Sequence, residues 1–173
     1  KDSGFKVGGF KAYVTSDVII GAGLSSSAAF ETLIGTIVSN LYNDGKISAI
    51  DIAIIGQYAE NEYFGKPCGL MDQMACSVGS LVNIDFEDVN KPKVERVECD
   101  LESYGFSLCV TDTKGSHADL TSDYAAIPEE MKSVARCLGK EVLGNTTKKD
   151  ILNNITEIRK KVNDRALLRA LHY

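Results

Sequence analysis

Hydrophobic residues recur every three or four positions in several parts of the chain, which is the spacing of one face of an α-helix. In the first part we expect a buried stripe made of Phe30, Leu33, Ile34, Ile37, Val38 and Leu41. The segment "NDG" then predicts the end of this helix. Ser48 and Asp51 open a second predicted helix that runs to Tyr63. The last third is predicted to be helical over about 122–138 and in shorter helices from Lys148 to His172.

Alternating hydrophobic and polar residues predict strands around these helices. The segment 10–15 (FKAYVT) alternates ahead of the first helix. Further strands are predicted at 79–86 (GSLVNIDF), 93–99 (KVERVEC) and 106–113 (FSLCVTDT), after a short helical piece at 70–77. Helices and strands in one chain predict the α+β class.

Composition narrows the classes of function. A chain of 173 residues with 44% hydrophobic and 25% charged residues has the composition of a globular domain with a sizeable core. A net charge of −5 without a basic run argues against nucleic-acid binding. We find no stretch long enough to span a membrane and no signal peptide, so we expect no membrane partner. The five cysteines form no CxxC pair, which disfavours a disulfide framework or zinc site and fits the cytoplasm.

The ends of the chain suggest a piece of a longer protein. The sequence begins at Lys1 rather than at an initiator methionine, and it ends at "LLRALHY", inside an apolar helical pattern. We therefore expect further chain on both sides.

Small residues crowd the start of the first predicted helix, in "GAGLSSSAAFE" at 21–31. A helix N-terminus has unpaired N–H groups and partial positive charge, and glycines let the backbone approach a ligand. Serine hydroxyls add donors, so the segment suits a phosphate. The alternative is that Ser25, Ser26 or Ser27 merely caps the helix. No Walker lysine follows, so the segment is not a P-loop of that type.

A second segment, "KPCGLMDQMAC" at 66–76, places Asp72 among small and apolar residues. One interpretation is a carboxylate that stabilises a helix start through the helix dipole. The other is a partly desolvated base that accepts a proton from a substrate hydroxyl.

The two segments together carry a resemblance. "GAGLSSSAAFE" followed by "AENEYFGKPCGLMDQMA" resembles the galactokinase family, within the superfamily of small-molecule kinases that also includes homoserine and mevalonate kinases. The resemblance continues through "VTDTKGSHADLTSDY" and the helical tail. Ile19 replaces the usual proline before the serine loop, and Ser116 replaces a frequent basic residue.

The resemblance implies a role for individual residues. The ATP phosphates would be bound by Gly21, Gly23, Leu24, Ser25, Ser26, Ser27 and Ala28. Mg²⁺ would be held by Ser27 and Glu60, although Glu60 taken alone is also compatible with a solvated helix acid. Asp72 would be the catalytic residue, and Gly69, Asp72 and Tyr124 would contact the sugar.

The implied reaction is transfer of the γ-phosphate of ATP to the 1-hydroxyl of galactose. A kinase for another hexose such as N-acetylgalactosamine, a non-catalytic galactose and ATP sensor, and a purely structural domain stay open as alternatives. Residues 1–104 would form the second half of an S5-like N-terminal domain, and 105–173 would begin a ferredoxin-like C-terminal domain. The family's N-terminal signature and glycine-rich third motif are not in this sequence, so we expect the chain alone to be inactive. We expect a monomer.

Overall fold

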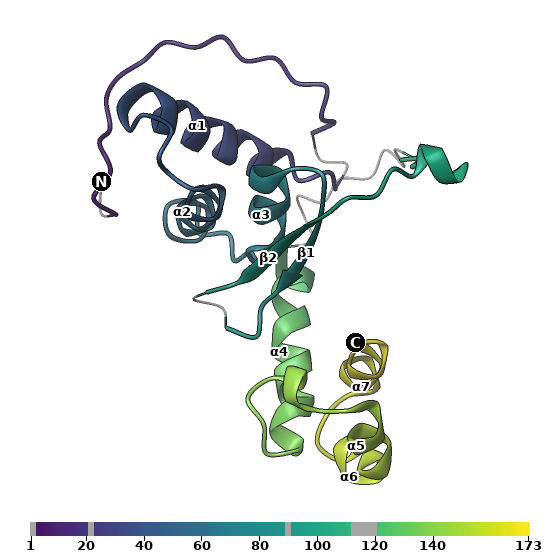
Figure 1. The fold of residues 1–173 in the computed structure, drawn as a ribbon. Helices are drawn as coiled ribbons and strands as arrows, with labels where there is room; N and C mark the ends of the chain where they lie inside the picture. Colours follow the sequence, from purple (N-terminus) through teal and green to yellow (C-terminus); the bar gives the residue numbers. More distant parts are fainter. Residues whose placement is uncertain (1–2, 21–22, 89–90, 112–120) are drawn as a thin grey trace. The chain divides into compact units, whose positions relative to one another are not determined.

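The structure, a computed structural model, describes residues 3–20, 23–88, 91–111 and 121–173. The chain divides into two compact units, unit 1 (1–118) and unit 2 (119–173). Unit 1 combines helices with a small sheet, and the described part of unit 2 is helical (Figure 1). The predicted α+β class is therefore confirmed. The S5-like and ferredoxin-like arrangements and a boundary near residue 104 stay predictions.

Unit 1 is built on three successive helices of the described chain, α1 (Ser26–Tyr42), α2 (Ala49–Glu62) and α3 (Met71–Val78), close to the predicted ranges. The Ser48 hydroxyl caps α2 by accepting a hydrogen bond from the Asp51 N–H at 3.1 Å, as the sequence predicts. The described helices include none that is long and apolar enough to cross a membrane.

The sheet of unit 1 pairs β1 (Leu81–Asp85) with β2 (Lys93–Val97) in antiparallel register. These strands confirm two predicted segments, and partly buried residues of the hairpin pack against a cluster formed by Ala53, Leu70 and Met74. After β2 the chain leaves the helices as an extended arm that carries a short 3-10 turn, Glu102–Tyr104 (Figure 1).

Two predicted strands are wrong. Residues 10–15 and 106–111 form neither strand nor helix, and residues 112 and 113 lie outside the described residues. A strand exists only through hydrogen bonds to a neighbouring strand, and within the described chain neither segment has one. Their side chains are accordingly open to solvent, with Tyr13 93% and Leu108 84% exposed.

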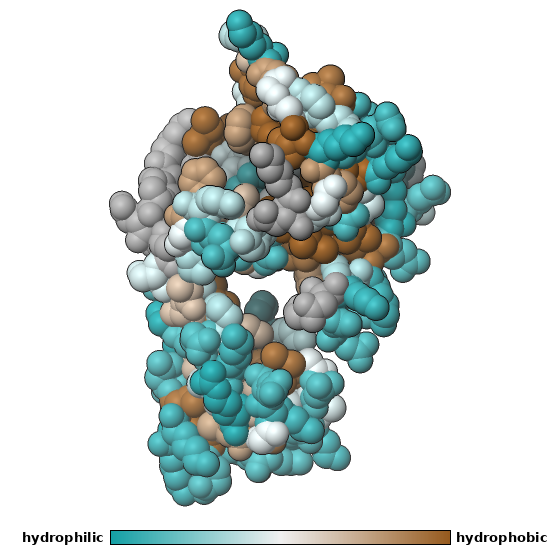
Figure 2. Space-filling view, turned by 90° about the vertical axis from the view of Figure 1, so that its left-hand side faces the viewer, coloured by the Kyte–Doolittle hydropathy of each residue, from teal (hydrophilic) through white to brown (hydrophobic). Residues whose placement is uncertain are grey.

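The buried face of α1 also differs from the prediction. Its buried residues are small or polar, namely Ala28, Thr32 and Ser39. Gly35 lies so close to α2 that a Cβ atom there would come 2.7 Å from Ile52 Cγ2. Small residues allow this close approach of the two helices. The large residues Phe30, Leu33 and Leu41 remain exposed instead. Figure 2 shows hydrophobic residues of this kind on the surface of unit 1, in the upper part of the view.

Unit 2 has its own core. Its helices are α4 (Thr121–Cys137), α5 (Lys148–Asn153), α6 (Ile155–Arg159) and α7 (Asp164–His172), with a 3-10 turn at Leu143–Asn145. The helical prediction for the last third is thereby confirmed. The buried cluster consists of Val134, Ala135, Leu143, Ile151, Ile158, Ala166, Leu167 and Ala170.

Candidate active site

The serine loop turns sharply into α1. Gly21 lies outside the described residues, whereas Gly23 and Ser25 both have a left-handed backbone, with φ of 76° and 56°. Ser26 is the first residue of α1, and Leu24 and Ser27 are exposed. Ala28 is buried, so its side chain serves packing. The loop thus exposes a helix N-terminus with two serines in its first turn.

The Ser25 hydroxyl does not cap α1. It makes no hydrogen bond to the first turn and instead donates to Asp72 Oδ2 at 2.6 Å, across 47 residues of sequence. The capping alternative is therefore wrong for Ser25. This contact joins the serine loop to the other segment singled out in the sequence.

Asp72 is the second residue of α3 and lies at its exposed start. The helix dipole favours a carboxylate in this turn, so the structural interpretation of Asp72 holds. The expectation of a partly desolvated side chain is wrong, because Asp72 is exposed. An exposed carboxylate beside a serine loop remains accessible to a substrate hydroxyl.

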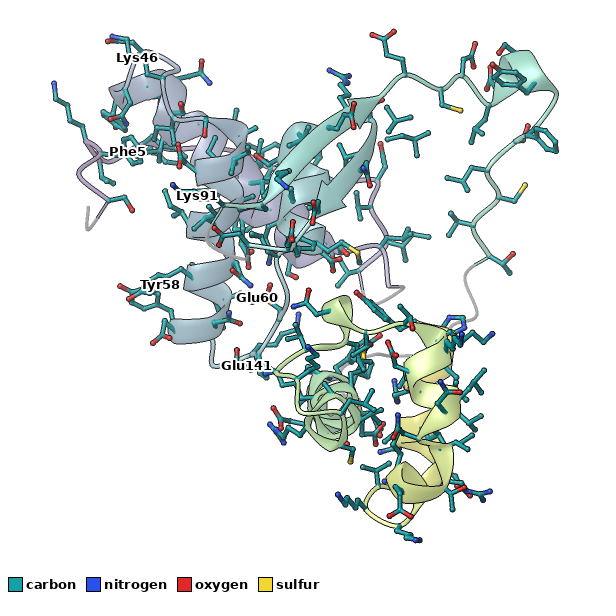
Figure 3. The ribbon with its side chains drawn as sticks, turned by 60° about the horizontal axis from the view of Figure 1, so that its bottom comes forward. Phe5, Lys46, Tyr58, Glu60, Lys91 and Glu141 are labelled. Atoms are coloured by element: carbon teal, nitrogen blue, oxygen red, sulfur yellow. The ribbon has the colours of Figure 1, made fainter. Side chains whose placement is uncertain are left out.

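Glu60 lies near the end of α2 and is only 4% exposed, so the solvated-acid alternative is wrong. Its Oε1 atom accepts hydrogen bonds from Ser27 Oγ at 3.2 Å and from Lys66 Nζ at 2.6 Å. Its Oε2 atom accepts one from Gln73 Nε2 at 2.7 Å. Figure 3 shows Glu60 and Tyr58 projecting from opposite sides of α2. The buried carboxylate therefore links α1, α2 and the start of α3.

These contacts keep Glu60 charged. Burial raises the pKa of Glu60, but the hydrogen bonds from Lys66 and Cys68, the Lys66 charge and the Ser27 hydroxyl together outweigh burial and bring the pKa below its ordinary value. The hydrogen bond to Glu60 raises the pKa of Lys66 in turn. Burial raises the pKa of the neighbouring Glu31, and the Glu60 charge adds to that rise. Glu60 and Lys66 therefore form an ion pair next to a second acid.

The donors at Glu60 fit Mg²⁺. Mg²⁺ prefers oxygen ligands and usually combines one or two carboxylates with phosphate oxygens and water. Glu60 supplies an ionised carboxylate, and the Ser27 hydroxyl lies 3.2 Å from it. Among the described residues, no three His, Cys, Asp or Glu side chains are grouped to hold a metal. A magnesium ion here would thus complete its ligand set with water and, in a nucleotide complex, with phosphate oxygens.

The two other residues predicted to contact the sugar lie in different units. Gly69 precedes α3 and is exposed, and a Cβ atom there would meet nothing within 4 Å. Backbone at Gly69 is consequently open to a ligand beside Asp72. Tyr124 is a residue of α4 in unit 2 and is 51% exposed. Its contact with a sugar stays a prediction.

A cavity of about 620 Å³ lies between α1, α2 and the amino-terminal segment. Phe5, Phe30 and Ile55 are among its apolar lining residues. Figure 3 shows Phe5 on that amino-terminal segment. The polar lining includes Ser27, Glu31, Glu60 and Lys66. The buried carboxylate cluster therefore opens into a pocket rather than into a closed core.

Sequence reasoning missed the neighbours of Glu60. Lys66, Gln73 and Glu31 were not predicted as site residues, yet Gln73 Nε2 donates to both Glu60 Oε2 at 2.7 Å and Glu31 Oε2 at 3.2 Å. Lys66 lies six residues beyond Glu60, after the helix has ended, so helical spacing gives no signal for the pair. Gln73 lies beside Asp72 in a quoted motif, and this proximity is the only signal that pointed to it.

Comparisons with known proteins match both segments of the site. Residues 1–80 match the family model "GHMP kinases N terminal domain". The chain is 31% identical over 172 residues to the galactokinase of Clostridium tetani, covering 99% of this chain and 43% of that protein. It is 36% identical over 148 residues to the galactokinase of Pyrococcus furiosus, covering 86% of this chain and 41% of that protein.

A third relative, the galactokinase of Thermotoga neapolitana, is 33% identical over 158 residues, which are 91% of this chain and 44% of that protein. The chain thus spans about two fifths of the length of these curated relatives. The expected resemblance is confirmed: residues 1–80 match a GHMP kinase N-terminal domain, and the chain is a homologue of galactokinases over most of its residues.

Proposed function

We propose that the whole protein is an ATP-dependent sugar 1-kinase that transfers the γ-phosphate of ATP to the 1-hydroxyl of galactose. The observation that carries this proposal is the 2.6 Å contact between Ser25 of the serine loop and Asp72. It brings the exposed start of α1 next to an accessible carboxylate. The names of the relatives supply the sugar.

Phosphoryl transfer mainly requires alignment of the reacting groups and neutralisation of phosphate charge. In this proposal the N-terminus of α1, with Ser25, Ser26 and Ser27, binds the ATP phosphates. Mg²⁺ held by Ser27, Glu60 and phosphate oxygens would neutralise charge on the transferred group.

Asp72 orients the sugar hydroxyl and accepts its proton as the hydroxyl oxygen bonds to the γ-phosphorus and the bond from that phosphorus to the leaving ADP oxygen breaks. Ser25 donates to the carboxylate and thereby fixes its direction. In this proposal the open backbone at Gly69 adds a further sugar contact. We further propose that the enzyme works as a monomer in the cytoplasm.

The test is ADP release by the whole protein with Mg-ATP, measured with galactose, N-acetylgalactosamine, glucose and mevalonate in parallel. We expect strong stimulation by galactose. Stimulation by another hexose alone would correct the substrate but keep the reaction. ATP binding without stimulation by any of these compounds would contradict the kinase proposal and favour a sensor.

A further inference from the structure

Lys66 holds the carboxylate oxygen to which Ser27 points. Both Lys66 Nζ, at 2.6 Å, and Ser27 Oγ, at 3.2 Å, contact Glu60 Oε1. An ammonium group therefore already occupies one side of the oxygen that the proposed function assigns to Mg²⁺. The second oxygen of Glu60 is bound to Gln73 Nε2 at 2.7 Å.

The two oxygens of Glu60 differ in how firmly they are held. Gln73 is 1% exposed and also donates to Glu31, so it fixes Glu60 Oε2 within the buried part of the cluster. The Lys66 side chain is 54% exposed, so it retains access to water. The backbone N–H of Lys66 donates to the Glu60 carbonyl at 3.2 Å. The backbone of Lys66 is thus tied to α2 while its ammonium group is able to leave the carboxylate.

A buried carboxylate without a cation would be costly, and it would also repel an approaching phosphate. Glu31 adds to this problem, because its carboxylate shares the Gln73 amide with Glu60. The Lys66 ammonium group forms an ion pair with Glu60 and so adds a positive charge to this cluster.

We propose that Lys66 is a positioning residue that neutralises Glu60 before the metal arrives and gives the carboxylate up to a divalent cation when metal-nucleotide binds. This inference rests on the proposed function, since it takes Glu60 as a magnesium ligand. Lys66 then competes with the metal for Glu60 Oε1 and keeps the empty site from repelling ATP phosphates.

Removing the ammonium group should separate its competition with the metal from its neutralisation of Glu60. Lys66→Met keeps the length of the side chain but leaves Glu60 Oε1 with Ser27 as its donor. A divalent cation then meets no competitor and should bind more tightly. Metal-free nucleotide, in contrast, meets an unneutralised carboxylate and should bind more weakly.

The experiment measures Mn²⁺ binding to the whole protein by electron paramagnetic resonance, without nucleotide. We expect Lys66→Met to lower the Mn²⁺ Kd about tenfold, a moderate effect because the lysine is half exposed and screened by water. Lys66→Arg, which keeps the charge, should stay close to wild type. The matched control is Lys46→Met, because Lys46 pairs with exposed Asp44 beyond the other end of α2.

A second arm measures the Kd of a non-hydrolysable ATP analogue with EDTA and with Mg²⁺. We expect Lys66→Met to raise the Kd of the analogue about tenfold in EDTA. In Mg²⁺ the Kd should stay within about twofold of the wild-type value. Additional Glu60→Gln should restore metal-free binding. Equal weakening under both conditions would make Lys66 an ordinary phosphate contact and overturn the inference.

An unchanged or raised Mn²⁺ Kd in Lys66→Met would also overturn it, as would a failure of both wild type and variant to bind Mn²⁺. The proposed function fails separately. If the Mn²⁺ result is as expected but no sugar is phosphorylated, the role of Lys66 stands and the kinase proposal falls.

Discussion

Glu60 shows how one side chain joins three parts of unit 1. It is 4% exposed, and donors from α1, α3 and the segment after α2 replace the water it has lost. Hydrogen bonds to an ionised carboxylate are stronger than neutral ones, which is why burial does not neutralise Glu60. The same cluster affects the chemistry of a neighbouring thiol, Cys68.

Cys68 should react slowly with alkylating reagents near neutral pH. Burial, followed by the nearby Glu60, raises the pKa of its thiol to about 11. Relative to an ordinary value of 9.0, this lowers the reactive thiolate fraction about 100-fold. We expect mass spectrometry after iodoacetamide treatment to find the exposed Cys99 and Cys109 labelled well before Cys68. Equal labelling of all three would contradict the described environment.

At the scale of residues, the sequence indicated the chemistry of the site but not the hydrogen bonds and ion pairs between its side chains. Residue type and family resemblance were enough to select Ser25, Ser27, Glu60 and Asp72. Lys66 was missed because its pairing depends on how the chain folds back after α2. That path is set by tertiary packing rather than by local spacing.

At the scale of elements, the close packing of α1 against α2, here called the seam, depends on Gly35. We expect Gly35→Ala to destabilise the protein by about 1–3 kcal/mol, because the added Cβ meets a branched side chain in a packed interface. That Cβ would lie 2.7 Å from Ile52 Cγ2. The free energy of unfolding from denaturant titration measures the effect.

The matched control is Gly56→Ala in α2, where the nearest atoms lie at an ordinary 3.4 Å. Alanine is the better helix former, so this variant should be about as stable as wild type or more stable by up to about 1 kcal/mol. Equal stability of the Gly35→Ala and Gly56→Ala variants would show that the seam is not tightly packed.

The helices were predictable and the strands only partly so. Periodicity and the Ser48 cap located α1 and α2, because a helix satisfies its own backbone hydrogen bonds. Alternation correctly predicted β1 and β2, which pair with each other across a hairpin. It failed at 10–15 and 106–111, because alternation says nothing of whether a partner strand is present. The buried face of α1 was also misassigned, since small residues rather than large ones form its seam.

At the scale of the whole molecule, the division into two units predicts separate folding. Unit 2 carries a buried cluster of its own, and Glu130 of α4 pairs with both Arg165 and Arg169 of α7. We expect residues 119–173 produced alone to be helical and to unfold cooperatively in far-UV circular dichroism. A broad unfolding transition in which the circular dichroism signal shows no folded baseline would contradict an independent core.

Two adjacent leucines of α7 give this prediction a control. Leu167 is 5% exposed and Leu168 is 66% exposed. In the isolated unit, Leu167→Ala should lower the free energy of unfolding by about 2–5 kcal/mol or prevent folding. Leu168→Ala should change it by no more than about 0.5 kcal/mol. Similar effects of the two substitutions would place the core elsewhere.

The central claim is that Asp72 acts on the sugar hydroxyl beside a phosphate-binding serine loop. The most direct test is the rate of phosphoryl transfer from Mg-ATP to galactose by the whole protein, compared between wild type and Asp72→Asn. Asparagine keeps an acceptor for the Ser25 hydroxyl but cannot take a proton. We predict a loss of rate of at least about 100-fold with nearly unchanged ATP binding. An Asp72→Asn variant that keeps most of its rate would contradict the role of Asp72.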